Sequence, residues 1–282
     1  MAWTAARLLC FKKMSSILDK IIAAKRAEVE NKRRSVPLSE LTARIASVEP
    51  PRPFAAALRE HAPAIIAEIK RASPSKGDIM PGLDPAAVAR AYAAAGAAAL
   101  SVLTDAHFKG SLDDLRAVRE AVGLPLLRKD FVVDPYQVYE SRCAGADCIL
   151  LIVAALADAG RLHSLIRLAR DLRMAALVEV HNAAEMAMAE DAGADLIGIN
   201  NRDLHSFRTD LGVTVELLRG YRGEALFVSE SGIETAGDIV RLSRAGASAF
   251  LIGESLLRDG APAASLARLT GVRLPAGDIG VS

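Results

Sequence analysis

The sequence predicts an α/β protein, a (β/α)8 or TIM barrel with an N-terminal helical extension, from three observations. Short apolar runs alternate with helix-length amphipathic segments over roughly two hundred residues, as in such a barrel. The phrase Ala-Gly-Ala recurs at 95–97, 144–146, 192–194 and 245–247, each time within a few residues of the next apolar run. Polar and charged residues follow these runs directly, where a parallel barrel has its active site.

The N-terminal region is expected to form helices that belong to the barrel. Between Ser16 and about Arg34, apolar residues recur at the spacing of one helix face. The proline-rich segment 49–53 separates this helix from a short one near 54–59. Because the region is too short to hold a core of its own, we expect a single domain over residues 15–272, with helices at about 15–60.

Both ends of the chain are expected to lie outside this domain. Residues 1–14 contain Arg and Lys but no acidic residue, which is faintly similar to a transit peptide. Met14 stands directly before the amphipathic helix, however, so we interpret 1–14 as an extension that is disordered or not native. Residues 273–282 are interpreted as a C-terminal tail.

The apolar runs after the N-terminal region have the lengths of buried strands. The Ala-Gly-Ala copies lie about fifty residues apart, which corresponds to two βα units. An open, doubly wound sheet is the alternative, but it usually has fewer strands, and no GxGxxG follows the first run. The expected strands are Ala64–Ile69, Ala99–Leu103, Pro125–Leu127, Cys148–Val153, Ala176–Val180, Leu196–Ile199, Leu226–Val228 and Ala249–Ile252.

Composition excludes several classes of function. The 282 residues are 51% hydrophobic and 24% charged, with a net charge of +1 and no basic stripe of the kind that binds nucleic acid. No apolar stretch is long enough to span a membrane. Three cysteines without a CxxC pair fit a reducing compartment, so we expect a cytoplasmic protein. No HExxH motif or group of His and Cys predicts a metal site.

Lysines and glutamates stand at the ends of the predicted strands, where their side chains are expected to surround one barrel mouth. Burial lowers a lysine pKa and raises a glutamate pKa, so such a cluster can exchange protons near neutrality. For Glu68 alone, a structural salt bridge is an equally good interpretation, and His107 and His181 are interpreted as loop residues. The residues at the strand ends are Glu68, Lys70, Lys129, Glu179, Asn200, Arg202, Glu230, Ser231 and Glu254.

A phosphate site is predicted where glycine and serine follow the last two strands. In this fold the corresponding loops often bind phosphate through backbone N–H groups. Ser231-Gly232 and Gly253-Glu254 occupy these positions, and Ser73 adds a hydroxyl after the first strand. Ordinary turn chemistry is the alternative for each glycine. Glu254 fits beside a phosphate only if its backbone binds and its side chain turns away.

At these residues the sequence resembles the indole-3-glycerol-phosphate synthase family. The resemblance runs in order from about Ser15 to Leu257 and includes the N-terminal helix. It implies ring closure of 1-(2-carboxyphenylamino)-1-deoxyribulose 5-phosphate to indole-3-glycerol phosphate, with loss of carbon dioxide and water and with no cofactor. The matching stretches are IAEIKRASPSKG (66–77), LSVLTDAHFKGS (100–111), PLLRKDFVVD (125–134), LVEVH (177–181), IGINNRDL (197–204), VSESGI (228–233) and FLIGESL (250–256).

The resemblance also implies a role for each candidate residue. Lys129 would be the general acid that protonates the ketone, and Glu179 would accept or relay protons. Lys70 would pair with the anthranilate carboxylate and could act as an acid in dehydration. Glu68 and Asn200 would hold Lys129 or Glu179 and the sugar hydroxyls in place. Glu230 and Ser231 would complete the polar rim. The phosphate would be bound by Ser73, Gly232, Gly253 and Glu254, and the aromatic ring by Phe108 and the aliphatic part of Arg202 or Leu204.

Two other functions are alternatives to this one. A phosphoribosylanthranilate isomerase would typically use a cysteine and an aspartate, whereas the first strand here ends with Glu68 and Lys70. A barrel that only binds a phosphorylated ligand or a partner would gain nothing from lysines and glutamates buried in its mouth, because burying charge is costly. We therefore expect a metal-independent enzyme, monomeric, whose partner is a small phosphorylated substrate.

Overall fold

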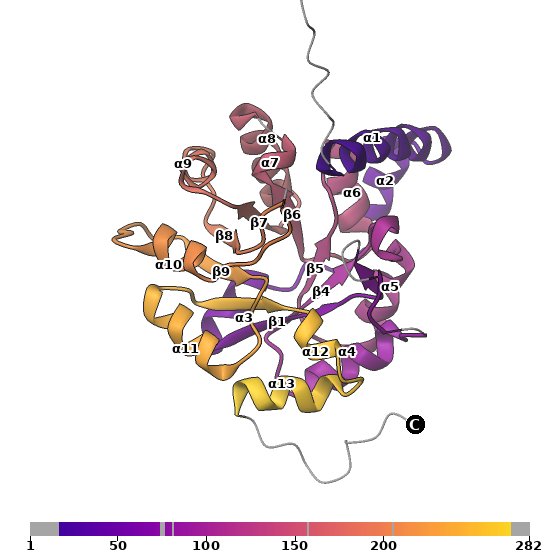
Figure 1. Cartoon of the computed structure of the whole chain (residues 1–282). Coiled ribbons are helices and arrows are strands. Elements are labelled where there is room, and N and C mark those ends of the chain that lie inside the picture. The colour runs from indigo at the N-terminus through magenta and orange to yellow at the C-terminus, as the bar shows by residue number, and fades with distance from the viewer. Residues whose placement is uncertain (1–16, 74–76, 81, 157, 205, 272–282) are drawn as a thin grey trace, which may run out of the picture.

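A closed barrel of parallel strands forms the centre of the computed structural model, which describes residues 17–73, 77–80, 82–156, 158–204 and 206–271 (Figure 1). Each strand pairs with the next one along the chain, and the last pairs with the first, so the predicted (β/α)8 barrel is confirmed. The predicted extension 1–14 and the tail 273–282 lie outside the described residues. The barrel strands are β1 (Ala64–Ile69), β4 (Ala99–Leu103), β5 (Leu126–Lys129), β6 (Cys148–Ile152), β7 (Ala175–Val180), β8 (Leu196–Asn200), β9 (Leu226–Glu230) and β10 (Ala249–Ile252).

Three strands extend further than the apolar runs predict. β5 continues to Lys129, β8 to Asn200 and β9 to Glu230. Asn200 is in register with Glu230, and Leu103 with Lys129. Ladder hydrogen bonds join backbone groups and do not depend on side-chain polarity, so the sheet continues past the point where the apolar run stops. These polar side chains therefore stand on strands rather than on loops.

Helices cover the outside of the barrel (Figure 1). Side-chain caps define where several begin: Ser111, Asp134 and Thr235 each form a capping box with the first turn. The glycine of each Ala-Gly-Ala copy has a positive φ, as predicted for a residue just past a helix end. The covering helices are α4 (Pro85–Ala94), α5 (Leu112–Ala121), α6 (Pro135–Cys143), α8 (Ala159–Asp171), α9 (Ala183–Asp191), α10 (Gly212–Leu218), α11 (Ala236–Ala245) and α13 (Pro262–Thr270).

Shorter elements fill the connections on the mouth side. They are the hairpin β2 (Ala72–Ser73) with β3 (Gly77–Asp78), the 3-10 turn η1 (Ala106–Phe108), α7 (Val153–Leu156) and α12 (Glu254–Leu257). Among the described residues, no helix has the length and apolarity that crossing a membrane requires.

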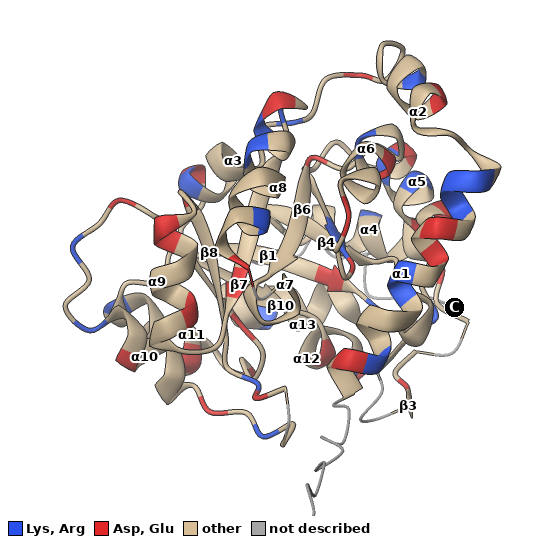
Figure 2. Ribbon diagram, turned by 90° about the horizontal axis from the view of Figure 1, so that it is seen from above, with Lys and Arg blue, Asp and Glu red and all other residues tan. Residues whose placement is uncertain are grey.

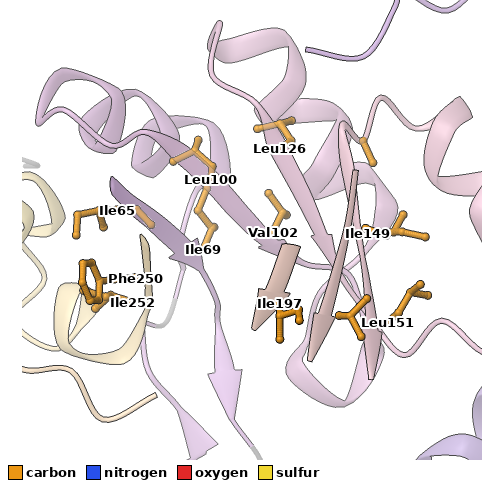
Figure 3. Packing of buried hydrophobic residues seen from close by; sticks show 14 of the residues in the cluster. Ile65, Ile69, Leu100, Val102, Leu126, Ile149, Leu151, Ile197, Phe250 and Ile252 are labelled. Atoms are coloured by element: carbon orange, nitrogen blue, oxygen red, sulfur yellow. The ribbon is translucent and has the colours of Figure 1, made fainter. Parts of the chain in front are cut away.

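Alternating strand residues divide the apolar core into two layers. Ile65, Leu100 and Phe250 belong to the outer layer, between strands and helices (Figure 3). Ile66 and Leu150 belong to the inner layer, inside the barrel. The inner layer also contains Phe54 and Leu58 of α3 (Phe54–Glu60), which pack near the first residues of β1 and β4. The interior of the barrel is therefore filled with apolar side chains at its amino-terminal end, and the cavity inside the barrel opens at the carboxyl ends of the strands.

Two N-terminal helices pack against one side of the barrel, beside α6 (Figure 1). They are α1 (Ile17–Ser35) and α2 (Leu38–Ile45), the second of which the sequence analysis did not predict. Val29 and Leu41 pack with Tyr136 of α6. Lys25 is buried, and its ammonium lies 2.7 Å from Asp105 and 2.9 Å from Asp130. Apolar packing and buried ion pairs together attach α1 to the barrel.

Candidate active site

A cavity of about 570 Å³ lies at the carboxyl ends of the strands. It brings together the candidate residues predicted from the sequence, with Ser73 as the exception. Ser73 belongs to β2, and its side chain lies outside the described part of the structure. The candidates that line the cavity are Glu68, Lys70, Phe108, Lys129, Glu179, Asn200, Arg202, Leu204, Glu230, Ser231, Gly232, Gly253 and Glu254.

Lys129 stands between two carboxylates at the centre of this cavity. Its Nζ lies 3.4 Å from Oε2 of Glu179 and 3.5 Å from Oε2 of Glu230. Burial by itself would lower the pKa of Lys129, but Glu179, Glu230 and Glu68 outweigh burial and raise that pKa well above its usual range. The Lys129 ammonium is therefore charged throughout the neutral range.

The expectation that burial would lower lysine and raise glutamate pKa values is wrong for most of the cluster. Burial would raise the pKa values of Glu179 and Glu68, but neighbouring lysines reverse the effect, and both pKa values lie below the ordinary range. The reason is that strands β1, β5, β7 and β9 bring opposite charges together, which sequence order does not reveal. Pairing overcomes desolvation when partners lie this close.

Glu230 is the exception in the cluster. Burial, opposed by Lys129 and reinforced by Glu179 and Glu68, raises the pKa of Glu230 to about 8. Its Oε1 has no hydrogen-bond partner among the described residues. That oxygen points toward Gly198 of β8, where a Cβ atom would lie 2.2 Å from it. Glycine at 198 therefore provides the space that the Glu230 carboxyl group occupies.

Glu68 and Lys70 form the second ion pair of the mouth, with 2.7 Å between Oε1 and Nζ. The Glu68 side chain packs against Gly253, where an added Cβ would lie 2.5 Å from Oε1 of Glu68. Lys70 is thus held by a carboxylate that is itself fixed by the backbone after β10. Both side chains come from the end of β1, as the alternation of that strand predicts.

Glu179 is held by neighbours on both sides. Asn200 Nδ2 donates to Glu179 Oε1 at 3.1 Å, and Asn200 Oδ1 accepts from the backbone N–H of Arg202. His181 Nε2 lies 3.3 Å from the same Glu179 oxygen. From the sequence, His181 is interpreted as a loop residue, and its contact with Glu179 is not predicted. The position of His181 two residues after Glu179, on the same side of an extended strand, is the signal that could have found it.

The loops after β9 and β10 form one side of the cavity. Ser231 and Gly232 both have positive φ, and a Cβ at Gly232 would lie 2.4 Å from a methyl group of Thr209. The Glu254 side chain turns toward arginines: its Oε2 lies 3.6 Å from Arg202 and its Oε1 3.4 Å from Arg258. The carboxylate of Glu254 is thereby paired with cations at the rim.

Apolar residues that the sequence analysis did not assign to the site complete the wall. Phe131, Leu103 and Phe207 line the cavity from the loops and from β4. Ile17, Leu18 and Ile21 of α1 also line it. The sequence shows the apolar face of α1, but it does not show that the start of this face reaches the barrel mouth. No group of three His, Cys, Asp or Glu side chains suited to a metal occurs within the described ranges.

Comparison with known proteins assigns the family. The family model described as indole-3-glycerol phosphate synthase matches residues 18–269. The protein of that name from Roseiflexus sp. (strain RS-1) is 51% identical over 254 residues, which cover 86% of this chain and 94% of that protein. The one from Laribacter hongkongensis is 49% identical over 262 residues, covering 91% of this chain and 99% of that protein.

Solved structures at low identity share the barrel alone. The 3-hexulose-6-phosphate synthase from Salmonella typhimurium has a TM-score of 0.59 at 14% identity, covering 74% of this chain and 97% of that one. The N-acetylmannosamine-6-phosphate 2-epimerase from Clostridium perfringens has a TM-score of 0.57 at 16% identity, covering 76% and 95%. With the family model matching most of its length and relatives about half identical, this chain belongs to the indole-3-glycerol phosphate synthase family.

Proposed function

We propose that the protein closes the indole ring in tryptophan biosynthesis, converting 1-(2-carboxyphenylamino)-1-deoxyribulose 5-phosphate to indole-3-glycerol phosphate as a carboxy-lyase. The observation that carries the proposal is the partly buried ammonium of Lys129 between Glu179 and Glu230, inside the mouth of a barrel of this family. A cation and carboxylates held at one point suit a reaction that needs both proton donation and proton acceptance.

Lys129 acts in the ring-closing step. As the aromatic carbon attacks the ketone, negative charge develops on the ketone oxygen, and a fixed ammonium beside it stabilises that charge. The high pKa of Lys129 keeps it protonated at neutral pH. The nascent alkoxide is a far stronger base than lysine, so Lys129 can still deliver its proton to it. Glu179 accepts or relays the protons released in later steps.

Lys70 pairs with the substrate carboxylate that leaves as carbon dioxide. Glu68 holds the Lys70 ammonium at 2.7 Å and so fixes where that carboxylate binds. Loss of the hydroxyl in the final dehydration needs a proton donor, and Lys70 and Glu179 are the candidates for that step. Asn200, which donates to Glu179, orients that carboxylate and the sugar hydroxyls.

The substrate phosphate binds on the side of the cavity formed by Ser231, Gly232, Gly253 and Glu254, with Ser73 contributing from the β1 side. Backbone N–H groups make these contacts. The Glu254 carboxylate points toward Arg202 and Arg258, which supports an arrangement in which only the backbone of Glu254 binds the phosphate. Phe108 and the aliphatic parts of Arg202 and Leu204 pack against the aromatic ring. Binding energy from the phosphate positions the reacting atoms at the other side.

The reaction needs no cofactor and no metal ion in this proposal. Its steps form a carbon–carbon bond, release carbon dioxide and release water, without a hydride or electron acceptor. Lys129 and Lys70 supply the positive charge that stabilises oxyanions. We further propose a cytoplasmic monomer that forms a single barrel over 15–272.

The test is a fluorescence assay of indole formation, with purified protein, the carboxyphenylamino-deoxyribulose phosphate and a chelator. Turnover in the chelator is the expected result. Turnover that disappears with the chelator and returns with added metal would contradict metal independence but not the reaction. A folded protein without turnover would contradict the proposed reaction. If that protein still bound the substrate, the result would favour a barrel that binds a phosphorylated ligand without catalysing a reaction.

A further inference from the structure

His181 lies between two carboxylates directly after β7. Its Nε2 is 3.3 Å from Oε1 of Glu179, and its Nδ1 is 3.0 Å from Oε2 of Glu185. The His181 side chain is only 11% exposed. Each ring nitrogen thus faces a carboxylate oxygen, and only the imidazolium carries a proton on both nitrogens.

Glu185 fixes the imidazole from behind. This glutamate lies in the first turn of α9, and its Oε2 also accepts the backbone N–H of His181 at 2.8 Å. Its Oε1 accepts from Nδ2 of Asn182, the residue that caps α9. Burial would lower the pKa of His181, but Glu179 and Glu185 raise it to about 10. The ring is therefore a fixed cation at neutral pH.

The two oxygens of Glu179 have different neighbours. Oε1 accepts a hydrogen bond from Nδ2 of Asn200 at 3.1 Å. The same oxygen lies at ion-pair distance, 3.3 Å, from Nε2 of His181, which has no hydrogen-bond partner among the described residues. Oε2 faces Lys129 at 3.4 Å. One oxygen of the carboxylate is thus held in place, while the other is directed toward the proposed general acid and the cavity.

We propose that His181 is a positioning residue for the reaction: its imidazolium holds one oxygen of Glu179, keeps that carboxylate ionised and directs the other oxygen at the reacting atoms. This inference rests on the proposed role of Glu179 as a proton acceptor. The charged groups around the imidazolium are Glu179 on β7, Glu185 on α9, Lys129 on β5 and Glu230 on β9. Without His181, Lys129 would face Glu179 and Glu230 with no second cation behind them.

The direction of the pH effect follows from this arrangement. Lys129 and then His181 lower the pKa of Glu179 against its burial, so removing the imidazolium raises that pKa. A reaction that needs ionised Glu179 would then lose activity at a higher pH than in the wild type. The acidic limb of the kcat profile is expected to move to higher pH.

The experiment compares His181→Gln and His181→Leu with the matched control His163→Gln. His163 is an exposed histidine on α8, and its Nδ1 contacts the carbonyl oxygen of Ala192 away from the cavity. For His181→Gln we expect kcat to fall by about tenfold to a hundredfold with KM changed by less than about twofold, since positioning acts on the chemical step. His163→Gln should keep both constants and the position of the acidic limb.

A purely structural role would lower the melting temperature of both His181 variants and leave the acidic limb in place, which would overturn the inference. An NMR spectrum of the ring nitrogens in the wild-type protein gives a second test. This test requires no substrate and does not depend on whether a variant folds. The imidazolium form of His181 should persist above pH 8. A neutral ring at pH 7.5 would overturn the inference even if the enzyme is active, whereas an imidazolium in a protein without turnover would contradict only the proposed reaction.

Discussion

Lys129 and its carboxylate neighbours keep several buried charges ionised within one cavity. Burial alone opposes the charged form of each group, yet the pKa values of Lys129 and Glu179 both move toward the charged form. Glu230 is the exception, because its burial, together with the charges of Glu179 and Glu68, outweighs Lys129 and raises its pKa to about 8. The protonation of any one residue is therefore a property of the whole group.

Replacing Lys129 by alanine should remove the proposed general acid. We expect turnover to fall by at least about 10²-fold to 10⁴-fold, the usual contribution of a positioned acid. The change leaves Glu179 and Glu230 without their shared cation, so both pKa values should rise. Turnover by the fluorescence assay and folding by circular dichroism check this together. Near-normal turnover in a folded Lys129→Ala protein would contradict the assignment.

Gly198 should be as necessary as the charged residues, although it has no side chain. The Cβ of Gly198→Ala would lie 2.2 Å from Oε1 of Glu230, so the carboxyl group must move. We expect kcat to fall by about tenfold or more, and stability by about 1–3 kcal/mol from overpacking. Gly123→Ala is the matched control, because a Cβ there meets nothing within 4 Å. Equal activity of the two variants would show that the position of Glu230 does not matter.

At the scale of elements, α1 is attached to the barrel by charge as well as by packing. Figure 2 shows basic and acidic residues side by side along this helix. Lys25 contacts Asp105 after β4 and Asp130 after β5, and Asp130 also pairs with Arg128 at 2.8 Å. Asp130 directly follows Lys129 in the chain. The helix that lines the cavity is therefore attached next to the strand end that carries the proposed acid.

Replacing Lys25 by methionine tests this attachment. The change removes the ammonium that Asp105 and Asp130 share and leaves Asp130 with Arg128 alone, and breaking a buried pair costs about 3–5 kcal/mol. Because Ile17, Leu18 and Ile21 line the cavity from the same helix, KM should rise as well. Chemical unfolding and steady-state kinetics measure the two effects.

The control for Lys25→Met is Arg26→Met, on the exposed side of the same helix. Its effect on the free energy of unfolding should stay within about 0.5 kcal/mol, as for other exposed positions. If both methionine variants unfold at the same denaturant concentration, the buried ion pairs do not hold α1 in place.

At the scale of the whole molecule, stability should depend on pH with a maximum between about pH 4.5 and pH 6.5. Glu179 and Glu68 have lowered pKa values, so their contribution is present above the ordinary value of 4.5 and is lost as pH falls. Glu230 and His181 have raised pKa values, and their contribution is lost as pH rises toward about 8 and about 10. The free energy of unfolding in urea should therefore be lower at pH 9 than at pH 6.

The difference between the two pH values should shrink in His181→Gln, which lacks one of the groups that titrate. A free energy of unfolding that is equal at pH 6 and pH 9, or higher at pH 9, would contradict the raised pKa values of both groups.

The alternation of apolar runs and amphipathic segments was sufficient to predict the barrel. In a parallel barrel the strand ends must converge, so the positions of Glu68, Lys129, Glu179 and Glu230 in the sequence also predicted which side chains share the cavity. Their individual roles stay predictions until the variants are measured. Strand limits were less predictable, because backbone pairing continues past the apolar residues to Lys129.

Contacts between distant segments were decided only by the tertiary structure. The direction of each pKa depends on which charges lie within a few ångströms, and the partners of Lys129 are 50 and 101 residues away in the chain. Packing between elements likewise decides that α1 lines the mouth of the barrel, and that Gly198 leaves space for the Glu230 carboxyl group. Periodicity and strand ends are local properties of the sequence, whereas electrostatics and cavity shape depend on distances that only folding sets.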